Sequence, residues 1–379
     1  MMKRIATTAL TILCFLPYLT FGQKYVKQSK KALDKGQYLE AERIITEASQ
    51  GSHMTAEGWL IYAKVYAKMI QQGIKKSGMD ESDMVRAVTA AWTKAASLDI
   101  GNTITESMIM VDKSNLYIFF SNKANDAYIQ RKLKEAEWNF GQLTLISPQD
   151  TFGYFNAALC AMEAQDYKAA EPYLQSLVEM DKASPRVMMN LISIQNTFLN
   201  KPQAAYLTAK KAIKKYPNNL EVQKFFTQVA FQSGKSEEAN SSLQKLLVAE
   251  PNNATLWLMQ GILAEKQKDN KQAITAYKRA LELNPNSYEA AYNVGSLYFN
   301  RAGDRSKALM DMSSADFNKH KEAYEEEIKK DFKLALPYLE TCAKLRPKAR
   351  VVWSSLSAIY LKLDMPEKAK IASDNFSNN

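Results

Sequence analysis

Three prolines that recur at a fixed interval constrain this chain more than any other feature of its sequence. Pro217, Pro251 and Pro285 are equally spaced, and each follows a stretch of apolar residues at helical spacing. Because proline cannot continue a helical hydrogen-bond ladder, each of them marks the end of a helix. A period of about 34 residues indicates repeated units that stack on their neighbours, rather than one closed globular core.

The unit that ends at Pro285 shows how one repeat folds. Trp257 and Gly261 fall on one face of a first helix, and Ala273 and Tyr277 fall on one face of a second. Small residues let the two helices approach closely, while the aromatic side chains fill the remaining space. This spacing resembles the tetratricopeptide repeat, and the resemblance implies an α-solenoid built from helix-turn-helix pairs.

The same register extends in both directions and predicts about nine repeats. With Trp257 counted as position 4, position 8 is small in every repeat: Ser29, Ala63, Ala124, Ala158, Ser193, Thr227, Gly261, Gly295 and Ser357. We therefore expect an all-α fold, a right-handed α-solenoid over residues 23–379, with 254–287 as its best-matching repeat. Extra residues near 71–82, 103–115 and 302–330 interrupt the period.

Each interruption carries its own prediction. We expect Gln71–Ser82 to project as a loop and Thr103–Asn115 to lengthen the first helix of the repeat that follows. The pattern predicts a complete first helix over Tyr288–Arg301, and one long helix over Phe317–Leu345 that starts at a cap near Ser313. The charged outer part of this long helix favours a solvated projection over a docking element.

The segment that precedes Gln23 predicts export. Met1–Arg4 is a short positive segment, Ile5–Leu19 is mostly apolar, and Thr20–Gly22 offers small residues before a cut. This is the pattern of a secretory signal peptide, and it is too short and wrongly flanked for a stable membrane span. We expect no transmembrane segment after signal removal.

Charge and composition exclude several classes of function. The chain has 50 Lys and Arg against 40 Asp and Glu, a net charge of +10, but the charges alternate in sign along helix faces. A nucleic-acid module would need a dense basic block with interleaved aromatics, so no nucleic acid is expected. His53 and His320 have no second ligand at metal spacing, so we expect no metal and no cofactor. Phosphate loops and hydrolase motifs are absent from the sequence, and we expect no enzyme activity.

The resemblance also implies a binding face. Ligands of tetratricopeptide arrays usually lie on the concave face and touch positions 2, 5, 6, 9 and 12 of the first helices. Transferred to this chain, these positions give the predicted peptide-binding residues Asn125, Tyr128, Phe152, Phe155, Asn156, Leu159, Met162 and Asn190, with Tyr292 and Asn293 in a second strip. The apolar side chains would form an adaptable strip, and the asparagines would offer amides to a peptide backbone. In the alternative, Phe152, Phe155 and Leu159 pack against neighbouring repeats.

These expectations favour a non-catalytic protein–protein interaction scaffold or adaptor in the cell envelope. The end of the signal segment and the content of lysine and asparagine resemble exported proteins of the Bacteroidetes group, so we expect a periplasmic location; association with the outer membrane or secretion are the alternatives. Two other functions stay open. One is a carbohydrate-uptake binding protein of the starch-utilisation type, although those are typically longer lipoproteins. The other is a regulatory subunit of an envelope enzyme.

Overall fold

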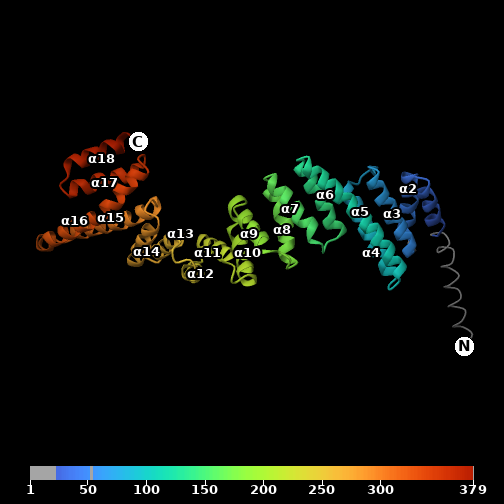
Figure 1. Ribbon diagram of the computed structural model, residues 1–379, viewed down its shortest axis with the longest axis horizontal. Helices are drawn as coiled ribbons and strands as arrows, with labels where there is room; N and C mark the ends of the chain where they lie inside the picture. Colours follow the sequence, from blue (N-terminus) through green and yellow to red (C-terminus); the bar gives the residue numbers. More distant parts are fainter. Residues whose placement is uncertain (1–22, 52–53, 379) are drawn as a thin grey trace, which may run out of the picture. The chain divides into compact units, whose positions relative to one another are not determined.

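The chain is all-helical in the parts that the structure describes. The computed structural model describes residues 23–51 and 54–378, so the predicted signal peptide (residues 1–22) and His53 lie outside the described residues (Figure 1). These residues form helices joined by turns and bends. They divide into two compact units, one ending at Asn200 (unit 1) and one beginning at Lys201 (unit 2).

Unit 1 opens with a helical segment at residues 23–34. It continues with α2 (Tyr38–Gln50), α3 (Ala56–Gln71), α4 (Glu81–Leu98), α5 (Thr103–Ile129), α6 (Leu133–Ile146), α7 (Thr151–Glu163), α8 (Tyr167–Glu179), α9 (Pro185–Ser193) and a π-helical turn η1 (Ile194–Phe198).

Unit 2 contains α10 (Pro202–Lys215), α11 (Leu220–Gln232), α12 (Ser236–Ala249), α13 (Ala254–Lys266), α14 (Asn270–Leu283), α15 (Tyr288–Met310), α16 (Ser314–Leu345), α17 (Arg350–Lys362) and α18 (Pro366–Asn378).

In chain order, the helices of the described residues form nine consecutive pairs, as the repeat count predicts. Within each unit a first helix contacts its partner, and the partner contacts the next first helix, as in α5–α6–α7 or α13–α14–α15. Eight pairs lie within one unit, and the fifth has α9 in unit 1 and α10 in unit 2. The fold class, an all-α solenoid of helix pairs, is confirmed.

The small residue at position 8 is needed because the paired helices touch there. A Cβ added at Gly261 would lie 2.3 Å from Cδ1 of Tyr277, and one added at Gly295 would lie 2.8 Å from Cγ of Leu339. Such approaches are too short for a side chain, so glycine lets the first helix rest directly on the partner's large residue.

The turn inside a pair repeats as regularly as the helices do. The backbone adopts a positive φ of 50° to 73° at the same repeat position in seven pairs: Gly36, Arg131, Gln165, Asn200, Gly234, Lys268 and Asp364. Only two of these residues are glycine, the residue that adopts this conformation without strain. Packing of the two helices therefore imposes the positive φ. The type of residue at that position does not predict it.

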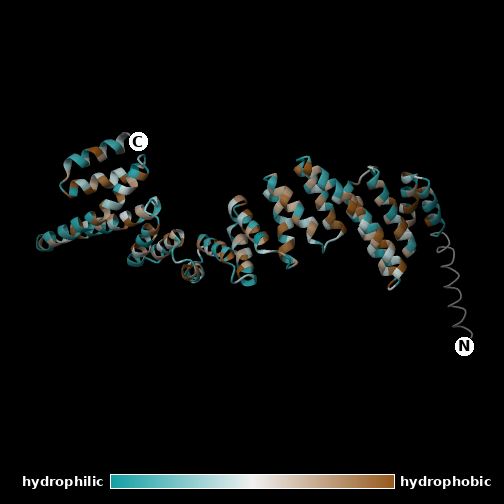
Figure 2. Cartoon of the chain, in the orientation of Figure 1, coloured by the Kyte–Doolittle hydropathy of each residue, from teal (hydrophilic) through white to brown (hydrophobic). Residues whose placement is uncertain are grey.

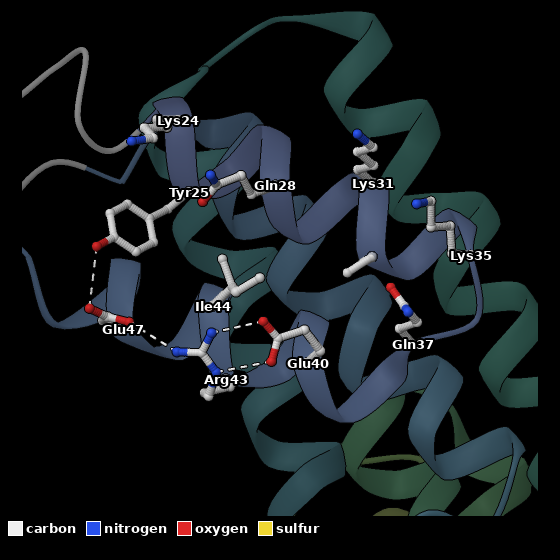
Figure 3. A pocket seen from close by; sticks show the side chains of 11 residues that line it. Lys24, Tyr25, Gln28, Lys31, Lys35, Gln37, Glu40, Arg43, Ile44 and Glu47 are labelled. Atoms are coloured by element: carbon white, nitrogen blue, oxygen red, sulfur yellow. Dashed lines mark hydrogen bonds and ion pairs between the residues drawn. The ribbon is translucent and has the colours of Figure 1, made fainter.

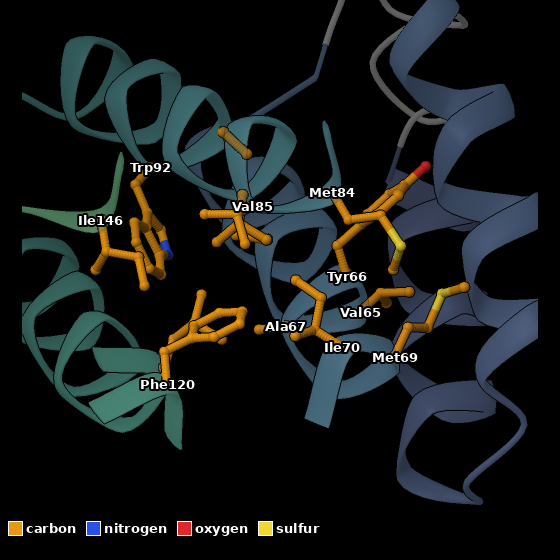
Figure 4. Close-up of a cluster of buried hydrophobic side chains, with 14 of the residues drawn as sticks. Val65, Tyr66, Ala67, Met69, Ile70, Met84, Val85, Trp92, Phe120 and Ile146 are labelled. Atoms are coloured by element: carbon orange, nitrogen blue, oxygen red, sulfur yellow. The ribbon is translucent and has the colours of Figure 1, made fainter. Parts of the chain in front are cut away.

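The core of unit 1 is filled from several helices at once. Figure 4 shows Val85 and Trp92 of α4 facing Phe120 of α5, with Ile146 of α6 beside them. All four side chains are buried. Each pair therefore closes its hydrophobic face only against its neighbours, which is why such repeats are stable in arrays rather than singly.

The loop between α3 and α4 does not project, contrary to the prediction for Gln71–Ser82. Lys76 Nζ lies 2.5 Å from Glu42 Oε1 on α2, and both side chains are mostly buried. Two apolar residues of the loop, Ile74 and Met79, pack against the core of unit 1. An ion pair that is shielded from water, together with apolar contacts, holds this loop on the helices.

The predicted helix Tyr288–Arg301 continues to Met310, so α15 is longer than expected. Gly303 lies inside α15 and does not end it, and Ala302 joins the core of unit 2 with Phe332 of α16. The predicted Phe317–Leu345 helix lies within α16. The extra residues thus lengthen both helices of one pair into a hairpin, instead of forming a single projecting helix.

The outer part of the α15–α16 hairpin is hydrophilic, as the sequence predicts. Figure 2 shows hydrophilic residues along much of α16, and its residues 321–326 are exposed apart from the half-buried Tyr324. In the described part of the chain, no helix has both the length and the apolar character needed to cross a membrane.

Candidate functional site

The predicted strip on α7 presents two aromatic side chains to solvent. Phe152 and Phe155 are each 42% exposed. Asp150 caps this helix by accepting a hydrogen bond from the Phe152 backbone N–H at 3.1 Å, and it accepts a second bond from the Tyr117 hydroxyl of α5 at 2.5 Å. The cap therefore starts α7 and ties it to the preceding first helix.

A second tie joins the other ends of these two helices. Tyr128 of α5 donates its hydroxyl proton to Glu163 Oε1 of α7 at 2.7 Å, and Arg131 Nη1 lies 3.2 Å from Glu163 Oε2. The hydrogen bond to Glu163 raises the pKa of Tyr128, because the carboxylate stabilises the protonated phenol. Asn125, one turn before Tyr128, is exposed. The predicted residues of α5 and α7 thus belong to neighbouring helices that are fixed at both ends.

The two exposed aromatic residues of α7 differ in whether they pack against a neighbouring repeat. Phe152 meets Phe140 of α6 edge to face, with ring centroids 5.9 Å apart, so part of this ring packs against the preceding repeat. Phe155 has the same exposed fraction as Phe152 and no ring contact among the described residues. We conclude that Phe155 offers the more available ring, while Phe152 supports it from one turn away.

The remaining predicted residues of this strip are half-buried. Leu159 and Met162 follow on α7, and Asn190 lies on α9. Asn156 donates its side-chain N–H to the carbonyl of Phe152 at 2.8 Å. This bond leaves the amide oxygen of Asn156 to accept from a ligand, so the residue can bind one backbone N–H without breaking its own contact.

In unit 2, the predicted Asn293 lies at a hollow between α13, α14 and α15. Ile262, Glu265 and Tyr277 line it as well, and the Tyr277 hydroxyl donates to Glu265 Oε2 at 2.8 Å. Burial, followed by this hydrogen bond, raises the pKa of Tyr277. Tyr292 instead stacks on Tyr288 with ring centroids 5.9 Å apart. The second strip is therefore more polar than the first.

A hollow at the start of unit 1 was not predicted from the sequence. Figure 3 shows Lys24 and Lys31 of the first helical segment, with Lys35 in the turn that follows it, opposite a group of charged residues on α2. There Arg43 bonds both carboxylate oxygens of Glu40, at 2.8 and 3.0 Å. The hydrogen bond from Arg43 lowers the pKa of Glu40. The lysine face is the less compensated side of this hollow.

The exposure of several apolar residues on α5 was also not predicted from the sequence. Ile104 is 70% exposed, Met110 68% and Val111 59%, although α5 buries its opposite face in the core of unit 1. The signal that could have revealed them is a second apolar stripe on the same helix, which periodicity shows when both faces are examined.

The cysteines are buried and no metal-ligand cluster is present in the described residues. Burial raises the pKa of the Cys160 thiol to about 11 and that of Cys342 to about 12. No group of three or more His, Cys, Asp or Glu side chains within residues 23–51 and 54–378 is placed to hold a metal ion.

Comparison with known proteins identifies the repeat. A family model described as "Tetratricopeptide repeat" matches residues 228–288 and 258–311, which include the best-matching repeat predicted above. Human protein O-mannosyl-transferase TMTC3 is 23% identical over 274 residues, covering 68% of this chain and 29% of its own length. This chain therefore spans less than a third of that relative.

The chain is also similar, over part of its length, to solved structures, among them two described as TPR proteins. The C-terminal part of a TPR repeat-containing protein from Cytophaga hutchinsonii is 15% identical with a TM-score of 0.48, covering 67% of this chain and 92% of that one. YrrB, described as a TPR protein with an unusual peptide-binding site, is 17% identical with a TM-score of 0.40, covering 53% of this chain and 96% of that one.

Proposed function

We propose that this tetratricopeptide repeat protein is a non-catalytic scaffold or adaptor of the cell envelope, and that it binds a peptide or protein partner on the first helices of unit 1. The export that this requires rests on the signal pattern of residues 1–22. The proposed contact surface is centred on Phe155. It consists of Asn125 and Tyr128 on α5 and of Phe152, Phe155, Asn156, Leu159 and Met162 on α7.

The observation that carries the proposal is the exposure of Phe155 on a helix that is otherwise firmly held. An aromatic ring that is 42% exposed leaves apolar area to be buried by a partner, and rigid aromatic residues are common anchors of interfaces. The two hydrogen-bonded ties between α5 and α7 keep the ring in place before binding. A pre-positioned anchor loses little conformational entropy when a partner arrives.

A cross-linked pull-down from envelope fractions tests the proposal. We would compare the wild type with Phe155→Ala/Asn156→Ala, and identify captured proteins by mass spectrometry. Leu39→Ala is a matched control, because Leu39 is 59% exposed in the same unit but lies on the second helix α2. Circular dichroism would verify that each variant is folded.

We expect a partner that the wild type and the Leu39 control capture and that the double variant loses by about tenfold or more. Equal capture by all three proteins would show that the partner binds elsewhere and would contradict the proposed surface. Capture of glycans without any protein would favour the carbohydrate-uptake function instead.

A further inference from the structure

Helix α5 carries a stripe of exposed residues along its whole length. Successive members alternate four and three residues apart, and we call them the α5 seam: Ile104, Met108, Val111, Asn115, Ile118, Asn122, Asn125 and Ile129. All eight are exposed, and the apolar ones are 45% to 77% exposed. This is the a and d spacing of a coiled-coil heptad, sustained over about three and a half heptads.

The packing of unit 1 does not account for this seam. The face of α5 that enters the core carries other residues, among them Leu116, Phe120 and Ala124, which are fully buried. Figure 4 shows Phe120 among the buried side chains of the unit 1 core. Helix α5 is therefore apolar on two sides, and one of them is unoccupied in the described part of the chain. Contiguous apolar surface of this kind marks a site for another molecule.

The spacing of the seam specifies a helix as the occupant. Residues at alternate intervals of four and three form a nearly straight row on an α-helix, and this is the row along which two helices pack side by side with knobs in holes. An extended peptide has a side-chain period of two and would match few of these positions. With 27 residues, α5 offers a row about 40 Å long.

The asparagines of the seam indicate which helix binds to it. Asn115, Asn122 and Asn125 occupy three seam positions, and no side-chain hydrogen bond joins any of them to another described residue. A polar residue at a seam position costs stability unless an equally polar residue lies across from it, and asparagine pairs are known to fix the register of parallel helices. The sequence that supplies matching asparagines at these intervals is the α5 seam itself.

We propose that the α5 seam binds the α5 seam of a second copy of this chain, so that two copies form a parallel, in-register pair of helices. In this arrangement each asparagine lies opposite the same asparagine of the second copy, and each isoleucine lies opposite the same isoleucine. An antiparallel pair with level ends would instead place Asn115 against Ile118 and Asn122 against Val111 of the second copy.

Charges beside the seam agree with the parallel arrangement. Positions on one flank hold Ser107, Ser114 and Ser121, and positions on the other flank hold Asp112, Phe119 and Asp126. In a parallel pair the first flank of one copy meets the second flank of the other, so that serines rather than carboxylates lie across from the aspartates. No like charges are brought together.

Sedimentation equilibrium of the chain from Gln23 onward tests the proposal, at concentrations of roughly 1 to 100 μM. We expect a monomer–dimer equilibrium for the wild type. Ile118→Lys places two like charges opposite each other and should weaken dimerisation by roughly a hundredfold or more. Met110→Lys is the matched control, because Met110 is 68% exposed on the same helix but lies off the seam; it should dimerise as the wild type does.

A monomeric wild type over this range would overturn the proposal and would leave a foreign helix as the occupant. A dimer that survives Ile118→Lys would also overturn it. Asn115→Lys, at an exposed position, repeats the test if Ile118→Lys unfolds. The two surfaces share Asn125, which these variants leave unchanged. The double variant Phe155→Ala/Asn156→Ala should still dimerise, because neither residue belongs to the α5 seam, so the loss of partner binding and the loss of dimerisation can be told apart.

Single cysteines determine the direction of the pair. Ile118→Cys should form a disulfide between two copies on mild oxidation, while Met110→Cys should not. The native Cys160 and Cys342 are buried and do not interfere. A disulfide that forms only when Ile118→Cys is mixed with Asn115→Cys would contradict the parallel arrangement.

Discussion

Two of the three regions where extra residues enter the repeat pattern differ in how they are held. In unit 1, the loop between α3 and α4 folds back and inserts Lys76 beside the buried carboxylate of Glu42. In unit 2, the extra residues lengthen α15 and α16, and the outer part of α16 remains exposed to solvent. Both insertions are rich in charge, so charge alone does not decide whether an insertion docks or projects.

The difference lies in what each insertion can bury. The loop of unit 1 packs Ile74 and Met79 against the core. This packing holds Lys76 at a site that is shielded from water. The hairpin of unit 2 buries Ala302, Ile328 and Phe332 near its base, whereas Leu309 is the one buried residue between Gly303 and Glu327. The part of an insertion that carries buried apolar residues packs on the neighbouring helices. Charged groups in that part then form ion pairs that are shielded from water.

The largest effect is expected at the base of the hairpin. Asp331 of α16 is 1% exposed and accepts hydrogen bonds from Arg301 and Arg305 of α15, the latter at 2.9 Å. Asp331→Ala should lower the free energy of unfolding of unit 2 by about 2–3 kcal/mol, because two arginines lose their shared partner while staying partly solvated. Chemical denaturation would measure this. Asp331→Asn, which keeps the shape but removes the charge, should cost less; an equal cost would indicate that the lost charge accounts for the whole effect and packing for none of it.

A smaller effect is expected from release of the loop in unit 1. Lys76→Met removes the ammonium group that contacts Glu42 and the Tyr66 hydroxyl, and should lower the free energy of unfolding by about 1 kcal/mol. Limited proteolysis should then cut between α3 and α4 faster than in the wild type. Lys75→Met is the control, because the structure gives Lys75 no hydrogen bond or ion pair with a described residue. Equal cleavage of both variants would contradict the anchoring role of Lys76.

Acid should release the same loop. Burial alone would raise the pKa of Glu42, but hydrogen bonds from Lys76, Thr46 and Tyr66 outweigh it and lower the pKa below its ordinary value of 4.5. A carboxyl whose pKa is lower in the folded state stabilises the fold above its ordinary pKa, and this stabilisation is lost as pH falls through the folded-state value. Proteolysis of the loop should therefore increase below about pH 4.5 in the wild type and change less in Lys76→Met.

Hydrogen exchange would sharpen the comparison without any substitution. Amides at the hairpin tip, near residues 306–322, should exchange much faster than those of α15 and α16 near Ala302 and Phe332, because few apolar contacts hold the tip closed. The amides of α3 and α4 next to the docked loop should resemble the core. Uniform protection along the whole hairpin would show that its outer part is held by contacts that the described residues do not reveal.

The smallest effect concerns the two cysteines, one in each unit. Because burial raises the pKa of Cys160 to about 11 and that of Cys342 to about 12, little thiolate is present at pH 8. Both should react with a thiol reagent at least roughly a hundredfold more slowly than in the unfolded chain. Cys342 lies on α16, so Asp331→Ala should speed its labelling and leave that of Cys160 unchanged.

Helix pairs could be predicted from the sequence because each repeat obeys the same contact. Gly261 and Gly295 had to be small where the partner's Tyr277 and Leu339 rest on them, and this requirement recurs in every repeat. The lengthening of α5 by residues 103–115 was predicted for the same reason, since its helical spacing continues without a break.

The docked loop and the longer α15 could not be predicted, because both depend on contacts between distant residues. Lys76 reaches a carboxylate two helices earlier in the chain, and α15 continues past Arg301 because Ala302 packs on α16. The π-helical turn at Ile194–Phe198 was also missed, because nothing in the repeat pattern marks it.

The residues of the candidate site were chosen by repeat position, and their geometry did not follow from that position. Repeat positions place Phe155 and Asn156 on the first-helix face, and the structure shows that Phe155 is exposed there. The sequence could not show that Asn156 bonds the carbonyl of Phe152, or that Tyr128 is tied to Glu163, because side-chain partners do not follow from repeat position.

Photo-cross-linking at Phe155 tests the central claim most directly. A benzoyl-phenylalanine placed at this position in cells should capture a partner protein, while the same group placed at Leu39 on α2 should not. Capture from Phe155 alone would establish that the first helices of unit 1 bind a partner. Absence of any product at Phe155, in a protein that is folded and exported, would contradict the account.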